Sequence, residues 1–164
     1  MNVYFNESIK EISGYDYSKR IEVNLRKAFE GEFNGSVNVE NKFEWINIRK
    51  FGDSISFSNA SGNLNANKWG DNYSISGNIK GEDGKYKYIS LTVYKRFSDE
   101  FSFAINSYGI NIYFDKYSVN GNFDETLYSK KTIAYITSMI FAIEIDSIKS
   151  NKANIQIKEN YLLN

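Results

Sequence analysis

Carboxylate pairs are the acid–base groups whose spacing in this sequence could support catalysis. Three such pairs occur: Glu40 with Glu44, Asp99 with Glu100, and Asp124 with Glu125. Two carboxyl groups on either side of a sugar linkage form the active site of a glycosidase, and their separation decides the mechanism. However, adjacent residues of a strand point to opposite faces. We therefore interpret the two adjacent pairs, Asp99/Glu100 and Asp124/Glu125, as charges of turns and solvent-exposed surfaces.

Other catalytic and metal-binding chemistries lack their usual side chains. The chain has no histidine and no cysteine, which excludes Ser-His-Asp and Cys-His centres, thiolate metal sites and disulfides. Oxygen ligands for calcium occur in the turn 81–84 and around Asp71, but neither segment has the spacing of an EF-hand. We expect no enzyme activity, no metal and no other cofactor.

Aromatic side chains are the remaining candidates for function. The sequence contains 13 Tyr, 12 Phe and 2 Trp, and a tyrosine combines an apolar ring with a polar hydroxyl, which suits a binding surface. Trp69 lies in a segment that contains Gly and Asn, and Tyr108 and Tyr113 also lie close to Gly or Asn in the sequence. We predict these three residues as binding residues, with the alternative that Trp69 folds back to seal the end of a barrel.

Short alternating runs predict the elements that position these residues. From about residue 33 to 123, apolar residues recur every second position between turn residues, and no proline interrupts them, as in antiparallel strands. Segment 48–57 resembles 94–103, and 71–79 resembles 115–123. We predict a mainly β (α+β) protein, in which a duplicated antiparallel β-meander, about 42–81 and 88–125, forms a sandwich or barrel.

The segment before residue 30 fits two structures. Apolar residues alternate over 21–25 as in a half-buried strand, whereas Ile21, Leu25 and Phe29 also lie one helical turn apart. Asp16 can cap such a helix. We favour an N-terminal helix.

The segment 132–143 is apolar on almost every side, yet it is too short and too polar to span a bilayer. Its β-branched residues fit a central strand, while Ser129 can cap it as a helix. We favour a buried C-terminal helix that covers the sheet or is enclosed by it, followed by a closing strand at Ile155 and Ile157. The side chains expected to be buried are Ile133, Ile136, Ile140 and Ile143.

Length and charge limit the possible partners. The 164 residues fit a single domain, 1–164. Lys plus Arg and Asp plus Glu both number 20, so no net charge attracts nucleic acid or an anionic membrane. The first residues contain no apolar signal segment, and we expect a cytoplasmic protein.

These observations favour a non-enzymatic binding protein. We predict that it recognises a protein partner and inhibits or neutralises it, in the manner of an immunity protein or a phage- or plasmid-encoded inhibitor. The alternative is a β-barrel that binds a small apolar ligand or lipid, because alternating strands also build such a cavity.

Overall fold

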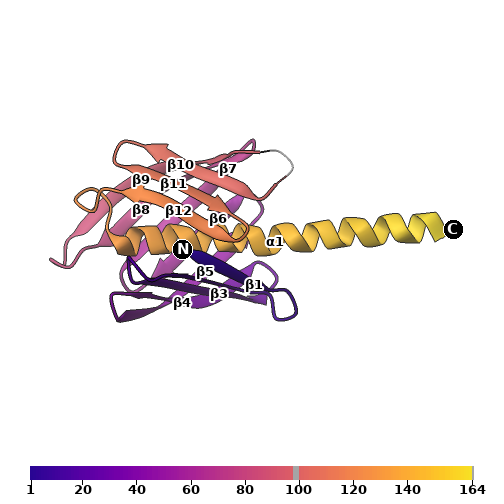
Figure 1. Cartoon of the computed structure of the whole chain (residues 1–164), viewed down its shortest axis with the longest axis horizontal. Helices are drawn as coiled ribbons and strands as arrows, with labels where there is room; N and C mark the ends of the chain where they lie inside the picture. The colour runs from indigo at the N-terminus through magenta and orange to yellow at the C-terminus, as the bar shows by residue number, and fades with distance from the viewer. Residues whose placement is uncertain (98–99, 164) are drawn as a thin grey trace.

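A computed structural model describes the backbone of residues 1–97 and 100–163, and the side chains of residues 1–97 and 100–147. Twelve antiparallel strands form a closed barrel, and a C-terminal helix runs through it (Figure 1). The elements are β1 (Asn2–Asn6), β2 (Glu11–Asp16), β3 (Ile21–Phe29), β4 (Glu32–Val39), β5 (Lys42–Phe51), β6 (Ser54–Asn59), β7 (Gly62–Trp69), β8 (Asn72–Lys80), β9 (Tyr86–Lys95), β10 (Ser102–Ser107), β11 (Ile110–Asp115), β12 (Ser118–Phe123) and α1 (Lys130–Leu163).

The barrel is one continuous meander. Each strand pairs with the next along the chain, and β1 closes the barrel by pairing with β12. Connections that follow even-numbered strands therefore lie at one end, and those that follow odd-numbered strands lie at the other. We call the first the start end, because α1 begins there after β12, and the second the exit end, because α1 leaves the barrel there (Figure 1).

Alternation along the strands separates an apolar inner wall from a polar outer wall. In β6, for example, Ile55 and Phe57 are buried, while Ser54, Ser56 and Ser58 are exposed. A strand of period two places successive side chains on opposite faces. The mainly β prediction and the buried C-terminal helix are therefore confirmed, and of the two predicted arrangements, sandwich or barrel, the protein forms the barrel.

The predicted N-terminal helix is wrong. This segment forms β3, in which Ile21, Val23 and Leu25 are buried on the inner wall. Asp16 caps no helix, because its carboxylate accepts the backbone N–H of Lys19 in the turn between β2 and β3. The alternating pattern prevailed because closing the barrel requires β3 to pair with both β2 and β4.

The helix α1 is surrounded by the barrel. Its first turn is capped by Ser129, whose hydroxyl accepts the backbone N–H of Thr132 at 3.1 Å. The apolar residues of α1 that are buried are Ile133, Ala134, Tyr135, Ile136, Met139, Ile140, Phe141, Ala142 and Ile145. These positions cover every side of the helix. Of the four isoleucines expected to be buried, Ile143 is only half-buried, and the closing strand expected at Ile155 and Ile157 is wrong, because α1 continues through both residues.

Two glycines allow neighbouring strands to approach closely. Gly77 of β8 pairs with Leu64, and Gly121 of β12 pairs with Ile112. A Cβ atom at either glycine would lie 2.0 Å from a carbonyl oxygen of the paired strand, and both have positive φ angles, 156° and 139°. Gly35 of β4 pairs with its neighbour in the same way and would meet a carbonyl oxygen at 1.9 Å. Close backbone approach therefore recurs at the fourth, eighth and twelfth strands.

The two segments predicted as a duplication correspond to successive groups of four strands. Residues 42–81 contain β5 to β8, and residues 88–125 contain most of β9 and all of β10 to β12. The matched segments 48–57 and 94–103 both cross from one strand to the next at the exit end. The duplication itself stays a prediction.

Replacing Ile140 with Ala should lower the free energy of unfolding by about 2–5 kcal/mol, because it removes apolar contacts and leaves a cavity. Ile140 is fully buried between α1 and the inner wall. Urea unfolding of the variant and the wild type measures this difference. A loss below about 0.5 kcal/mol, the size typical of a surface position, would contradict the placement of α1 inside the barrel.

Gly77→Ala and Gly52→Ala form a matched pair that tests the close approach of β7 and β8. Both glycines have positive φ angles, but a Cβ atom at Gly52 would meet nothing within 4 Å. We expect Gly52→Ala to cost about 1–2 kcal/mol for the unfavourable φ angle, and Gly77→Ala to cost more, because the methyl group also clashes with backbone. Thermal unfolding measures the loss of stability in each variant. Equal losses would mean that the close approach of β7 and β8 does not constrain position 77.

Candidate functional site

The three residues predicted to bind a partner do not all come together. Trp69 is the last residue of β7, at the exit end, and is exposed. Tyr108 lies in the β10–β11 turn at the start end and is also exposed. Tyr113 is half-buried on the outer wall of β11, where the guanidinium carbon of Arg96 lies 4.5 Å from the centre of its ring. Trp69 and Tyr108 therefore mark opposite ends of the barrel.

The exit end carries a set of exposed aromatic side chains, which we call the aromatic rim. Each member lies at the end of an odd-numbered strand or in the connection that follows it, and between 53% and 89% of its surface is exposed. The members are Phe29, Phe51, Trp69, Phe97 and Tyr117. Tyr and Trp are enriched among the residues that carry most of the binding energy of interfaces.

Tyr113 is connected to this rim through Arg96. The guanidinium carbon of Arg96 lies 5.1 Å from the ring centre of Phe97 as well as 4.5 Å from that of Tyr113. Its Nη1 atom also lies 3.6 Å from a carboxylate oxygen of Asp115. Of the predicted binding residues, Trp69 and Tyr113 thus belong to the exit half of the barrel, while Tyr108 does not.

A repeated sequence pattern could have revealed the rim. A basic residue, an aromatic residue, Gly or Ser, and Asp follow one another at 50–53, 68–71 and 96–99. Of these aromatic residues the sequence prediction includes Trp69 alone, because local patterns do not show that three distant turns lie at the same end of a barrel. The structure describes the first two turns fully and the third as far as Phe97.

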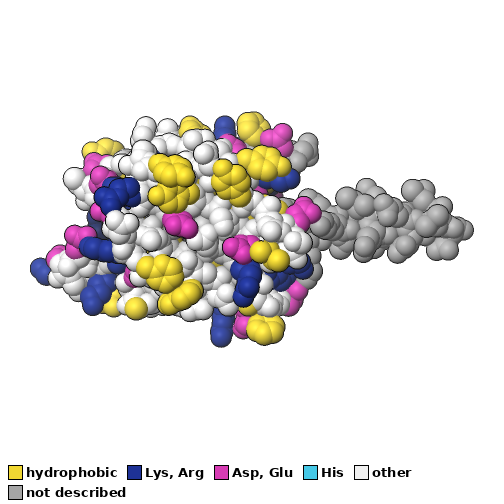
Figure 2. Space-filling model, turned by 60° about the horizontal axis from the view of Figure 1, so that its bottom comes forward, with side chains coloured by type: hydrophobic (Ala, Val, Ile, Leu, Met, Phe, Trp, Pro, Cys, Tyr) yellow, Lys and Arg dark blue, Asp and Glu magenta, His cyan; other side chains and the backbone are white. Residues whose placement is uncertain are grey.

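The outer wall of β6, β7 and β8 carries no charge between the two ends of the barrel. Its outward-facing residues are Ser54, Ser56, Ser58, Asn63, Asn65, Asn67, Ser74, Ser76 and Asn78. These residues lie side by side in three rows, as the strand registers show. The face drawn in Figure 2 shows much neutral surface in its middle, with yellow hydrophobic side chains and a few acidic side chains between them. The outer wall of β6 to β8 therefore offers no charged side chain to a partner between its two ends.

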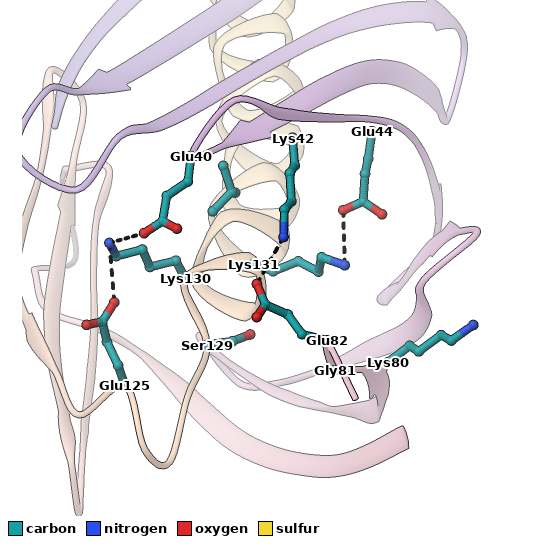
Figure 3. Close-up of a pocket in the computed structure, with 11 residues that line it drawn as sticks. Glu40, Lys42, Glu44, Lys80, Gly81, Glu82, Glu125, Ser129, Lys130 and Lys131 are labelled. Carbon is teal, nitrogen blue, oxygen red and sulfur yellow. Dashed lines mark hydrogen bonds and ion pairs between the residues drawn. The ribbon is translucent and has the colours of Figure 1, made fainter. Parts of the chain in front are cut away.

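The start end contains a charged pocket of about 320 Å³ beside the first turn of α1 (Figure 3). Lysine and glutamate side chains face each other across it. Lys130 Nζ lies 2.5 Å from Glu40 and 3.5 Å from Glu125, and Lys42 Nζ lies 3.1 Å from Glu82. Because the Lys130 ammonium donates to it, the pKa of Glu40 is lowered from its usual value.

Glu44 attaches α1 to the barrel wall at this end. One carboxylate oxygen accepts the Tyr135 hydroxyl at 2.6 Å and lies 3.5 Å from Lys131 Nζ. The other accepts the Ser61 hydroxyl at 2.5 Å. Burial, together with the hydrogen bond to Glu44, raises the pKa of Tyr135. The two glutamates of the Glu40–Glu44 pair are therefore bound to lysines and hydroxyls, as in a structural ion-pair cluster.

The other acidic residues singled out in the sequence have local roles. The Asp124 carboxylate accepts the hydroxyl and the backbone N–H of Thr126, which lowers its pKa. Asp83 accepts the backbone N–H of Lys85 in the β8–β9 turn. Glu100 is exposed, and Asp99 lies outside the described residues. Among the residues with described side chains, no group of three or more acidic residues is placed to hold a metal ion.

Glu144 is the unusual charged residue of the interior. It lies on α1 with 1% of its surface exposed, and among the described residues neither of its carboxylate oxygens has a hydrogen-bond partner. Burial raises its pKa to about 8, and the nearby Lys116 offsets only part of this effect. A buried carboxyl group without a partner is most stable in its neutral form. Glu144 is therefore protonated in the folded protein at neutral pH.

No protein family, curated protein or solved structure matches this chain. In the described part of the chain, α1 is neither apolar enough nor long enough in its apolar part to cross a membrane.

Glu144→Gln should make the protein more stable at alkaline pH and change little at pH 4. The folded pKa of about 8 is higher than the ordinary value of 4.5, so the folded state retains a proton that the unfolded state loses. The contribution of Glu144 to stability is therefore fully present below about pH 4.5 and is lost as the pH rises to about 8, by several kcal/mol in total.

Urea unfolding at pH 4, 6 and 9 measures this dependence. The glutamine variant should lack this decrease, since its side chain does not ionise. Glu82→Gln is a suitable control, because the Glu82 side chain is 88% exposed. If the difference between wild type and Glu144→Gln stayed constant across this range, Glu144 would not be the titrating group.

Proposed function

We propose that this protein is a non-enzymatic binding protein that recognises a protein partner through the aromatic rim and inhibits or neutralises it, as an immunity protein or a phage- or plasmid-encoded inhibitor does. The single observation that supports this proposal is the exposure of five large aromatic side chains at one end of the barrel. Interfaces concentrate their binding energy in a few such residues. We further propose a cytoplasmic location, as expected from the sequence.

The arrangement of the interior supports a protein partner better than a small apolar ligand. Barrels that bind such ligands leave an internal cavity. Here α1 occupies the interior, with Ile136, Ile140 and Phe141 buried between the helix and the wall. A ligand inside the barrel would have to replace these contacts. The outer surface is therefore the better candidate for recognition.

The partner is identified by affinity capture from cells that express the protein naturally, followed by mass spectrometry. A stoichiometric protein is the expected result, whereas a co-purifying lipid would favour the small-ligand alternative. Binding of the purified partner is then measured by calorimetry. This second step decides whether the rim forms the interface.

Trp69→Ala should weaken partner binding by about 2 kcal/mol or more, close to a thirtyfold loss, because it removes an anchor at the rim. Trp45→Ala is a matched control: Trp45 is 72% exposed and Trp69 75%, but Trp45 lies on β5 nearer the start end. Tyr108→Ala should also have little effect if the interface lies at the exit end alone. Equal losses for Trp45→Ala and Trp69→Ala would contradict a specific role of the rim.

Alanine substitutions at Asp83 and Asp124 should leave activity nearly unchanged, since both side chains stabilise turns at the start end. Loss of activity with normal folding and normal partner binding in either variant would instead indicate an acid–base or metal-dependent enzyme. Circular dichroism and calorimetry separate these outcomes.

A further inference from the structure

The exit end also contains an inner set of lysines, beneath the aromatic rim. Lys50, Lys68 and Lys95 continue the inward-facing alternation of β5, β7 and β9, after the buried residues of each strand. Lys27 lies at the corresponding place on β3. These strands end around the point where α1 leaves the barrel (Figure 1). Four ammonium groups thus lie on the inner side of the barrel mouth.

The helix neutralises only part of this positive charge. Asp146 of α1 lies 3.4 Å from Lys27 Nζ and 3.4 Å from Lys50 Nζ. Lys68 and Lys95 form no ion pair among the residues with described side chains; Lys95 Nζ instead lies 5.1 Å from the ring centre of Phe103. Within the described part of the chain, two cationic groups at the mouth therefore have no anionic partner.

Three of the four lysines, Lys50, Lys68 and Lys95, line a pocket of about 210 Å³ next to α1. Tyr73, Phe103 and Ile143 supply apolar lining, and Asp71 and Asp146 line the pocket as well. Tyr73 and Phe103 pack edge to face, with ring centres 6.0 Å apart. An ammonium group beside apolar surface binds an anion more strongly than one surrounded by water, because the local dielectric constant is lower.

We infer that this pocket receives an acidic side chain of the partner protein, while the aromatic rim contacts the apolar residues around it. This inference rests on the proposed function, because it assigns the chemistry of the partner for that same end of the barrel. Charge complementarity selects a carboxylate, and the volume suits one acidic side chain. Exposed aromatics around a buried charge pair exclude water from it, as in the centre of a tight interface.

The inference can be tested before the partner is known, with hexaglutamate as the probe. The chain has two tryptophans, so Trp45→Phe leaves Trp69, the neighbour of Lys68, as the single tryptophan reporter. Titration should give a saturable change in Trp69 fluorescence, weakened at least tenfold by raising the salt concentration from 50 to 500 mM. Hexalysine should produce no such change.

Charge variants locate the response. Lys68→Gln combined with Lys95→Gln should weaken hexaglutamate binding at least tenfold, whereas Lys80→Gln combined with Lys85→Gln, at the start end, should not. Lys68→Arg combined with Lys95→Arg should retain binding. If the first double variant does not fold, the single variant Lys68→Gln should still weaken binding by a measurable factor of about three.

Several results would overturn the inference. These are the absence of a fluorescence change up to millimolar hexaglutamate, an unchanged affinity of the Lys68/Lys95 glutamine variant, or a response to inorganic phosphate or to phosphatidylglycerol vesicles but not to hexaglutamate. The last would assign the pocket to a small anion or to a membrane surface.

The purified partner separates this inference from the proposed function. If Trp69→Ala weakens partner binding and the Lys68/Lys95 variant does not, the rim is the interface but the acidic contact is wrong. If hexaglutamate binds as expected and Trp69→Ala does not weaken partner binding, the pocket binds carboxylates and the proposed rim interface is wrong.

Discussion

The packing of α1 against the inner wall is the interaction on which the rest of this structure depends. A barrel of about eight strands can be filled by the side chains of its own wall, but a wider barrel leaves space. Twelve strands close here, and α1 fills their interior with residues buried on every side, such as Tyr135, Ile136 and Ile140. Neither part is stable alone: the helix is too apolar for water, and the barrel would otherwise contain a large cavity.

Polar contacts at both ends fix the helix along the barrel axis. At the start end, Glu44 accepts the Tyr135 hydroxyl, and at the exit end Asp146 lies between Lys27 and Lys50. Apolar packing alone permits a helix to slide by a turn, whereas these contacts specify one position. Glu144 differs, because its buried carboxylate oxygens have no partner among the described residues. It makes the stability of the assembly depend on its own protonation.

The filled interior also explains where recognition can take place. Since α1 occupies the site that other barrels offer to a ligand, the outer wall and the two ends are left. The outer wall of β6 to β8 carries Ser and Asn side chains without charge. At the start end, the lysines beside α1 are paired with glutamates. The exit end combines exposed aromatics with Lys68 and Lys95, which lack such partners in the described part of the chain, and we therefore propose it as the binding surface.

The sequence by itself determined the alternation of strands and the buried apolar segment near residue 140, because these depend on local periodicity and turn residues. It did not decide between strand and helix for Ile21, Val23 and Leu25, since both patterns are present there. Pairing of β3 with both of its neighbours decided it. Local patterns cannot include hydrogen bonds to strands that are distant in the chain.

The candidate site shows the same division. The basic–aromatic turns at 50–53 and 68–71 are visible in the sequence. The sequence does not show that Phe29, Phe51 and Trp69 belong to one rim. This follows only from the antiparallel meander, which brings every second connection to the same end. The same topology separates Tyr108 from Trp69. It also brings Lys68 and Lys95 next to Asp146 of α1, from which they are more than fifty residues away in the chain. Barrel closure around α1 therefore decided the site, because only that long-range packing places these charges and rings around one opening.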